Sequence, residues 1–251
     1  MFLKSQHIDG ASFVTDIVTN DYRTAEVFRK YGIEYCCGGK WPLEMVCPTK
    51  NIDLKILIKE LEEATRSIQL PNSLPFNEWD IDFLADYIVH VHHHYLKNQL
   101  PEIKSTLLKF SEEHREKFAY LQELENTFLQ LYNEMLPHIQ MEEETIFPYI
   151  RQLTHAFQSR ESYASLLVKT MRKPIEELMN HEHTMVAGAI HKMRELTGDY
   201  TPPARACTNH KVTFSKLKEL DNELVQHLHL ENNILFPRAI EMEKILLCKA
   251  S

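Results

Sequence analysis

The chain has 251 residues, of which 43% are hydrophobic and 25% charged, and its formal net charge is −8. This composition is ordinary for a soluble globular protein, and the acidic balance with scattered basic residues gives no sign of a nucleic-acid surface. No apolar run approaches the roughly 18–20 residues that span a bilayer, and the first residues lack the apolar core of a secretory signal. We therefore expect neither a membrane segment nor a nucleic-acid partner.

The five cysteines are an odd and sparse set, which is unsuited to a disulfide framework. Such a set fits a reducing compartment, so we expect a cytoplasmic protein. The 14 histidines, by contrast, are numerous and clustered. Their clustering favours a metal-binding function.

The first part of the chain predicts a small helical region. One helix is expected over about 21–31, ending at Gly32 as a C-terminal cap. A second carries an apolar stripe that begins at Leu54, with Asn51 or Asp53 as its N-cap. A polar stretch with prolines follows, and we interpret it as a linker.

Between these two helices lies the sequence YCCGGK, which contains Cys36 and Cys37. Adjacent cysteines rarely bridge to each other and this is not a Cys-x-x-Cys motif, so the residues alone favour a buried turn. The expected organisation is a small helical domain over 1–66, a linker over 67–78 and a larger domain over 79–251.

The larger domain is rich in helix-forming residues and poor in glycine, which predicts an all-α, antiparallel four-helix bundle. The four helices are expected over about 79–110, 113–152, 160–196 and 208–244. Breaks are expected near Ser111 and Ser159 and in the loop 197–203. Kinks are expected at Pro101, Pro137 and Pro174.

Two segments of the larger domain share one pattern. They are His138–Pro148 (HIQMEEETIFP) and His227–Pro237 (HLHLENNILFP), 89 residues apart. In both, a glutamate follows the histidine by four residues and Phe-Pro closes the segment, which we interpret as a helix end with Phe147 and Phe236 in the core. One helix earlier, each copy is preceded by a histidine cluster, which indicates a duplicated helix pair. The clusters are His90, His92, His93 and His94, and His181 and His183.

A histidine and a glutamate four residues apart share one face of a helix. Two such pairs, with one histidine from each of the other helices, give four nitrogens and two carboxylates. This set suits two first-row transition ions with the carboxylates as bridges. A ferritin-type site would instead show Glu-x-x-His and four glutamates, so the spacing favours a histidine-rich iron site. A single His-x-x-x-Glu is commonly a solvated pair, and only the repetition favours ligands.

Spacing does not decide which histidine of the first cluster binds a metal. His90, His93 and His94 could share a face, whereas His92 points elsewhere. We expect His181 and His229 not to be ligands. The histidines without a repeat partner are expected to lie at the surface, and they are His7, His114, His155, His191 and His210.

Together these residues resemble the iron–sulfur-cluster repair di-iron proteins, the repair-of-iron-centres family, over nearly the whole chain. Phe28–Lys40 (FRKYGIEYCCGGK) is similar to the signature of that family's small N-terminal domain, and five further segments follow in the family's order. They are QLPEI, HIQMEEETIFP, the pair Glu182-His183, PPARACT and HLHLENNILFPRA. The resemblance implies a haemerythrin-like bundle.

The resemblance also implies a cofactor and a ligand set. The cofactor is two non-haem iron ions, bridged by carboxylates and by an oxo or hydroxo group. Glu182 matches an acidic residue near the metal, with a catalytic or access role, and Cys36 and Cys37 would act in redox chemistry or iron handling. The implied terminal ligands are His93, His138, His183 and His227, and the implied bridges are Glu142 and Glu231.

Two features depart from the family pattern. The first histidine cluster is denser than the pattern requires, so His92 or His94 could replace His93. Met185 and Val186 stand where more polar residues are expected, which affects the lining of the pocket.

The family implies a cytoplasmic homodimer that restores iron–sulfur clusters damaged by nitric oxide or peroxide. Iron donation and reduction of nitric oxide to nitrous oxide are its two implied activities. The implied partners are damaged iron–sulfur proteins, nitric oxide or another diatomic ligand, and an unidentified electron donor. The alternatives are a haemerythrin-like oxygen or nitric oxide carrier or sensor without turnover, and a ferritin-like oxidase. The sequence YCCGGK and the two-glutamate set favour the repair protein.

Overall fold

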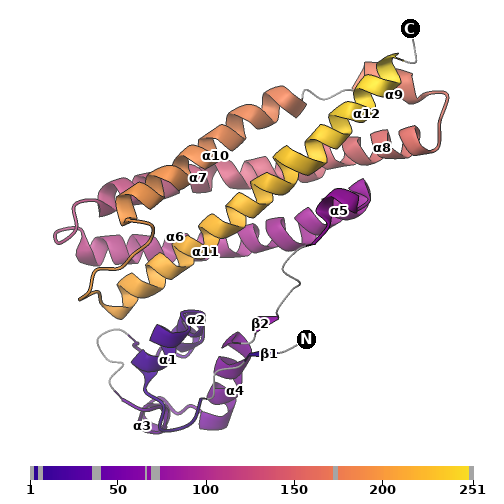
Figure 1. Cartoon of the computed structure of the whole chain (residues 1–251). Helices are drawn as coiled ribbons and strands as arrows, with labels where there is room; N and C mark the ends of the chain where they lie inside the picture. The colour runs from indigo at the N-terminus through magenta and orange to yellow at the C-terminus, as the bar shows by residue number, and fades with distance from the viewer. Residues whose placement is uncertain are drawn as a thin grey trace. The chain divides into compact units, whose positions relative to one another are not determined.

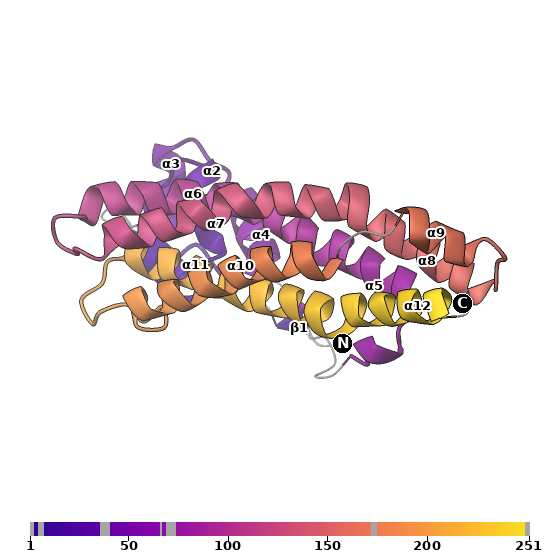
Figure 2. The ribbon, with the colours of Figure 1, turned by 90° about the horizontal axis from the view of Figure 1, so that it is seen from above.

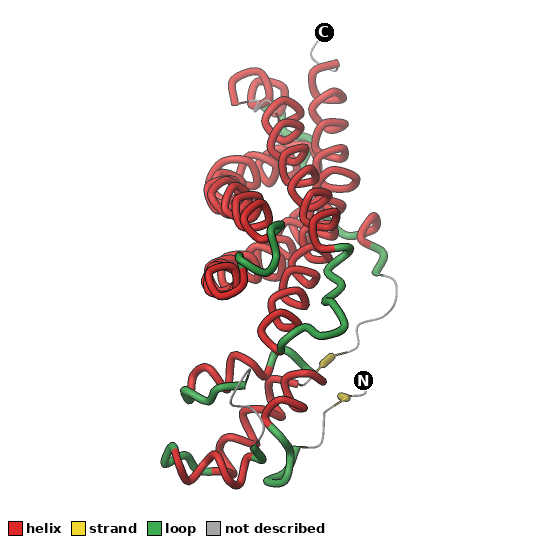
Figure 3. The backbone as a smooth tube through the Cα atoms, turned by 90° about the vertical axis from the view of Figure 1, so that its left-hand side faces the viewer, coloured by secondary structure: helices red, strands yellow, loops and turns green. Residues whose placement is uncertain are grey.

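The computed structural model of the chain describes residues 3–4, 8–35, 41–65, 67–68, 74–171 and 175–248. Over residues 3–4, 67–68, 171 and 175–182 it describes the backbone alone. Helices dominate the described residues, as Figure 3 shows, and this confirms the prediction of an all-α protein. None of the described helices combines the length and the apolar character that crossing a membrane requires.

The chain divides into two compact units. The first comprises Met1–Ser73 and Tyr200–Leu217, and the second comprises Leu74–Asp199 and Lys218–Ser251. Each unit is described by itself below.

The first unit is built from short helices and one small antiparallel strand pair. Its helices are α1 (Val14–Asn20), α2 (Thr24–Lys30), α3 (Leu43–Thr49) and α4 (Leu54–Thr65). Its strands are β1 (Leu3–Lys4) and β2 (Ser67–Ile68), with Leu3 opposite Ile68. Helices α1 and α3 are not among the predicted elements, and neither are the strands, which at two residues each are too short to show a period.

The two helices expected in this unit are confirmed. Helix α2 ends just before Gly32, whose φ of 61° is a left-handed conformation that glycine adopts without strain. Asp53 caps α4, because its Oδ1 accepts hydrogen bonds from the backbone N–H groups of Lys55 at 2.8 Å and Ile56 at 3.2 Å.

The core of this unit is apolar and includes one residue from the start of helix α11 (Thr208–Leu230). Ile17, Phe28 and Leu57 are buried in one cluster with Val212. His210 is also buried, with its ring against Phe214, so the expectation that it lies at the surface is wrong. Phe214, one turn away, contacts the ring of His210, and the absence of a repeat partner does not reveal such a contact.

The second unit is the helical bundle, drawn in Figures 1 and 2 as long rods that lie side by side. The first rod is α5 (Ile81–Tyr87), η2 (Ile88–His93) and α6 (His94–His114), and a 3-10 turn, η1 (Phe76–Glu78), precedes it. The second is α7 (Leu121–Met141), η3 (Glu142–Ile146) and α8 (Phe147–Gln158), followed by the short helix α9 (Ala164–Met171). The third is α10 (Ile175–Thr197). The fourth is α11, η4 (Glu231–Leu235) and α12 (Phe236–Cys248).

One expectation about these rods needs correction. The first rod does not break near Ser111 but continues to His114, because no glycine or proline marks its end. Helices α6 and α7 continue through Pro101 and Pro137, where the expected kinks stay a prediction, and Pro174 lies outside the described residues.

Phe-Pro does not end a helix in either repeat. The segments η2, η3 and η4 are π-helical, and Phe-Pro begins the α-helix that follows η3 and the one that follows η4. Pro148 and Pro237 are the second residues of α8 and α12. The Phe147 N–H bonds the Glu142 carbonyl, so the rod passes from the π-helical turn into α8 without a free helix end.

The buried stripe of the second rod leads directly into the candidate site. Leu131, Met135, His138 and Glu142 follow one another at spacings of four, three and four residues, and all are buried. The fourth rod repeats this order 89 residues later with Leu220, Leu224, His227 and Glu231, which are buried too. The polar residues therefore occupy core positions of the bundle.

Candidate metal centre

Six side chains from the four rods converge inside the bundle, and each is at most 4% exposed. His93 is the last residue of η2, and His183 lies within α10. Each of the two repeats supplies one histidine, from the last turn of an α-helix, and one glutamate, which begins the π-helical segment that follows. The six are His93, His138, Glu142, His183, His227 and Glu231.

These side chains form two groups of possible metal ligands, and within each group one donor atom of every residue lies within 4.8 Å of the others. One group is His93, His227 and both glutamates, which we call the His93–His227 position. The other is His138, His183 and both glutamates, which we call the His138–His183 position. Each histidine belongs to one position, and each glutamate belongs to both.

The histidines of each position face each other. The Nε2 atoms of His93 and His227 lie 3.1 Å apart, and those of His138 and His183 lie 3.2 Å apart. Transition ions hold nitrogen and oxygen at roughly 2.0–2.2 Å, so neighbouring ligands of one ion lie about 3.0–3.5 Å apart. Two nitrogen lone pairs at this distance repel each other unless a cation or a proton lies between them.

Glu142 directs one oxygen toward each position. Its Oε2 lies 3.4 Å from the Nε2 of His93, and its Oε1 lies 3.3 Å from the Nε2 of His138. A carboxylate placed in this way can bridge two ions, because each oxygen has its own lone pairs.

Glu231 makes the matching approach from the fourth rod. Its Oε1 lies 3.0 Å from the Nε2 of His227, and its Oε2 lies 3.6 Å from the Nε2 of His183. All four carboxylate oxygens of Glu142 and Glu231 are buried, and no described residue donates a well-oriented hydrogen bond to them. Buried carboxylates without partners are costly, so this donor set fits a metal site.

Hydrogen bonds behind two of the histidines fix their tautomers. The Nδ1 of His93 donates to Glu143 Oε1 at 3.0 Å, and the Nδ1 of His183 donates to Asn232 Oδ1 at 2.6 Å. Each Nε2 is therefore the nitrogen that can offer a lone pair to a metal ion. Burial would raise the pKa of Glu143, but its hydrogen bonds with Lys97 and His93 lower that pKa overall, so the group is ionised at neutral pH. Sequence reasoning missed Glu143 and Asn232, whose one signal is that each directly follows a repeated glutamate.

A phenylalanine ring stacks on each of these two histidines. Phe147 lies 5.6 Å from the ring of His93 with 15° between the planes, and Phe236 lies 6.0 Å from that of His183 with 20°. Both phenylalanines are buried, which confirms the expectation that they are core residues.

The buried charges shift the protonation of the candidate ligands. Burial lowers the pKa of His93, but Glu142 and Glu231 outweigh this effect and raise it to about 10. Burial, together with the negative charge of Glu231, raises the pKa of Glu142 to about 7. A metal ion must displace these protons in order to bind.

The structure separates the members of the first histidine cluster. Only His93 reaches the centre, while His90 and His94 are exposed. His92 is fully buried outside both positions, with its Nδ1 2.7 Å from Glu223 Oε1. Both histidines belong to the π-helical segment η2, but only His93 faces the candidate centre.

Three further candidate residues cannot be placed. Cys36 and Cys37 lie outside the described residues, and Glu182 is described by its backbone alone. The same holds for the side chain of His181, whereas His229 is exposed, as expected of a residue that is not a ligand.

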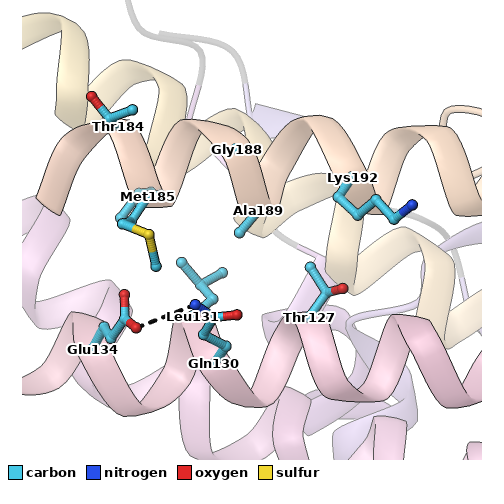
Figure 4. Close-up of a pocket in the computed structure, with 10 residues that line it drawn as sticks. Thr127, Gln130, Leu131, Glu134, Thr184, Met185, Gly188, Ala189 and Lys192 are labelled. Carbon is cyan, nitrogen blue, oxygen red and sulfur yellow. Dashed lines mark hydrogen bonds between the residues drawn. The ribbon is translucent and has the colours of Figure 1, made fainter. Parts of the chain in front are cut away.

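Two adjoining cavities lie between α7 and α10, and one of them reaches the centre. The cavity beside His138 has a volume of about 440 Å³, and Met135, Met141, Met185 and Val186 form much of its wall. Its neighbour, of about 360 Å³, shares Met185 and Val186, and Figure 4 shows Met185 of α10 facing α7 there. The wall next to His138 is therefore mainly apolar.

Comparison with known proteins agrees with this geometry. The family model described as "Hemerythrin HHE cation binding domain" matches residues 84–239, and the ScdA N-terminal domain model, described as a domain of unknown function, matches residues 11–65. The chain belongs to the hemerythrin HHE cation-binding family. The residues of this hemerythrin-type domain include all six side chains of the candidate centre.

This hemerythrin-type chain is similar in sequence to proteins named ScdA and YtfE. The iron–sulfur cluster repair protein ScdA of Staphylococcus haemolyticus (strain JCSC1435) is 29% identical over 229 residues, which covers 91% of this chain and 98% of the relative. The iron–sulfur cluster repair protein YtfE of Enterobacter sp. (strain 638) is 30% identical and covers 91% and 96%. The protein of that name from Escherichia coli O17:K52:H18 (strain UMN026 / ExPEC) is 30% identical and covers 88% and 93%.

Proposed function

We propose that this chain repairs damaged iron–sulfur clusters and that its bundle holds two non-haem iron ions. The observation that carries the proposal is the pair of histidine positions that share two buried carboxylates. The names of the relatives, which match over most of both chains, support the same function. The proposed terminal ligands are His93, His138, His183 and His227, and the proposed bridges are Glu142 and Glu231.

The side chains of the candidate centre offer the donor atoms that both proposed activities need. All four histidines present Nε2 atoms to the centre, hydrogen bonds at Nδ1 orient those of His93 and His183, and the glutamates offer oxygens that can change their binding mode. Bound iron would supply one electron from each of two ions, which with two protons is what reduction of two nitric oxide molecules to nitrous oxide and water requires. As cargo, iron would instead pass to a cluster that has lost it.

The apolar cavity beside His138 supports a small, uncharged molecule as a ligand of the centre. Nitric oxide needs few hydrogen bonds, so an apolar wall admits it more readily than hydrated ions. The same observation favours a second candidate function, namely a carrier or sensor of nitric oxide or oxygen without turnover.

Several finer parts of the proposal come from the family resemblance. We place the protein in the cytoplasm as a homodimer, with damaged iron–sulfur proteins as clients and an unidentified electron donor. Cys36 and Cys37 would act in iron handling or redox chemistry, and Glu182 would act beside the metal. The proposed domain limits are 1–66 and 79–251, with a linker over 67–78.

Metal analysis of anaerobically prepared protein tests the centre. We expect about two iron ions per chain, and His227→Ala should lose at least half of them. His229→Ala is the matched control, because His229 lies two residues away on the same helix and is exposed. Zinc as the bound metal, one ion per chain in the wild type, or equal loss in both variants would contradict the assignment.

A reconstitution assay separates repair from sensing. An iron–sulfur enzyme inactivated with nitric oxide is incubated with the purified, iron-loaded protein, and recovery of its activity is followed. Recovery that depends on the loaded protein supports repair. No recovery, together with tight and reversible nitric oxide binding, would establish the sensor instead.

A further inference from the structure

The two proposed metal positions differ in the residue behind one histidine. Behind His93 stands the carboxylate of Glu143, and behind His183 stands the amide of Asn232. Glu143 and Asn232 are equivalent in the repeat, since each directly follows a bridging glutamate and they lie 89 residues apart. The duplicated bundle therefore places unlike partners at like positions.

The two acceptors differ in charge. An ionised carboxylate that accepts the Nδ1–H of an imidazole increases electron density at its Nε2 and strengthens the metal bond, and a neutral amide does so less. Lys97, four residues after His93, bonds the second oxygen of Glu143 at 2.6 Å and holds the carboxylate in place. The residue four after His183 is Ala187, which cannot form such a bond.

The two positions also differ in access. His93 and His227 have no exposed surface, whereas His138 lines the cavity of about 440 Å³. A chelator or a small ligand thus meets the His138–His183 position first. The weaker hydrogen-bond partner and the open cavity lie at the same position.

We propose that Glu143 and Asn232 are positioning residues that make the two metal positions unequal. The His93–His227 position holds its ion firmly, and the His138–His183 position exchanges its ion. This inference rests on the proposed two-iron centre and identifies which of its two ions is transferred or meets the diatomic ligand.

Iron release to a ferrous chelator, followed by stopped-flow absorbance on the full-length, iron-loaded protein, tests the proposal. We expect the wild type to release its iron in two phases of about one equivalent each. Glu143→Gln replaces a carboxylate by an amide, and Asn232→Asp replaces an amide by a carboxylate. Neither changes the size of the side chain appreciably. The first should accelerate the slow phase about tenfold and the second should retard the fast phase, in line with other changes behind metal-bound histidines.

Glu144→Gln is the matched control, because it removes the same charge one residue away, where the side chain is exposed and bonds Gln140. Its release should equal that of the wild type. Mössbauer spectra provide a second readout, since the two quadrupole doublets expected of the wild type should become more alike in Glu143→Gln.

The outcomes distinguish this inference from the proposed function. Two irons per chain released in one phase, or Glu143→Gln and Asn232→Asp shifting the same phase in the same direction, would overturn the inference and leave the centre intact. Fewer than two irons in the wild type would overturn the proposed centre itself. If Glu143→Gln unfolds by circular dichroism, Asn232→Asp alone decides.

Discussion

Phe147 and Phe236 show how single apolar side chains serve the polar centre. Each fills the core at a repeat position and lies flat against a candidate ligand. A ring that is packed on both sides has few alternative rotamers, so the phenylalanine also orients the histidine. Stability and metal geometry therefore depend on the same contacts.

Replacing Phe147 should weaken both properties. Phe147→Ala should lower the free energy of unfolding by about 3–5 kcal/mol, because it leaves a cavity in the core, and should also lower the affinity for iron. Urea unfolding and metal titration measure the two effects. Phe83→Ala is the control, since Phe83 is 56% exposed on α5, and a loss as large as that of Phe147→Ala would contradict this account.

The sequence predicts most of the candidate ligands but not the residues that hydrogen-bond to them. The pairs that start at His138 and His227 follow from a spacing of four residues, and the structure brings them together. The choice of His93 over its neighbours needed the family resemblance, because η2 changes the helical period there. Glu143 and Asn232 could not be identified, since a residue next to a ligand points away from it in a regular α-helix.

Among the helical segments, the three π-helical turns depart most from expectation. Each lies at or directly after a candidate ligand, and a wider turn changes the direction of the side chains around it. No residue pattern marks such a turn. The prediction that Phe-Pro ends a helix is therefore wrong, whereas the prediction of long helical rods is confirmed.

Two prolines should respond differently to replacement by alanine. Pro101 is exposed inside α6, where it removes a backbone hydrogen bond, so Pro101→Ala should stabilise the protein by about 1–3 kcal/mol. Pro148 lies at the junction of η3 and α8, where the α-helical hydrogen-bond pattern is already interrupted, so Pro148→Ala should change stability by less than about 1 kcal/mol. Chemical denaturation of both variants measures the difference, and equal effects would contradict it.

For the chain as a whole, metal binding and folding are linked through protons. The raised pKa of His93, about 10 against an ordinary 6.5, stabilises the metal-free fold below pH 6.5, and this stabilisation is lost as the pH rises toward 10. The raised pKa of Glu142, about 7 against an ordinary 4.5, makes the metal-free fold lose further stability as the pH rises from 4.5 to 7, and this loss persists above pH 7. Metal-bound ligands carry neither proton.

The stability difference between iron-loaded and metal-free protein should therefore widen as the pH rises from 5.5 to 8.5. Thermal unfolding of both forms at three pH values measures it, and proton release on iron uptake in weakly buffered solution checks the cause. A difference that stays constant or narrows over this range would show that these two groups do not control uptake.

The assignment of ligands to the two positions has a mechanical consequence. The first two rods supply His93 and His138, and the last two supply His183 and His227, so each position takes one histidine from either half of the duplicated bundle. No half carries both imidazoles for one ion. Every bound ion would thus cross-link the two halves of the bundle, and release of an ion would weaken the contact between them.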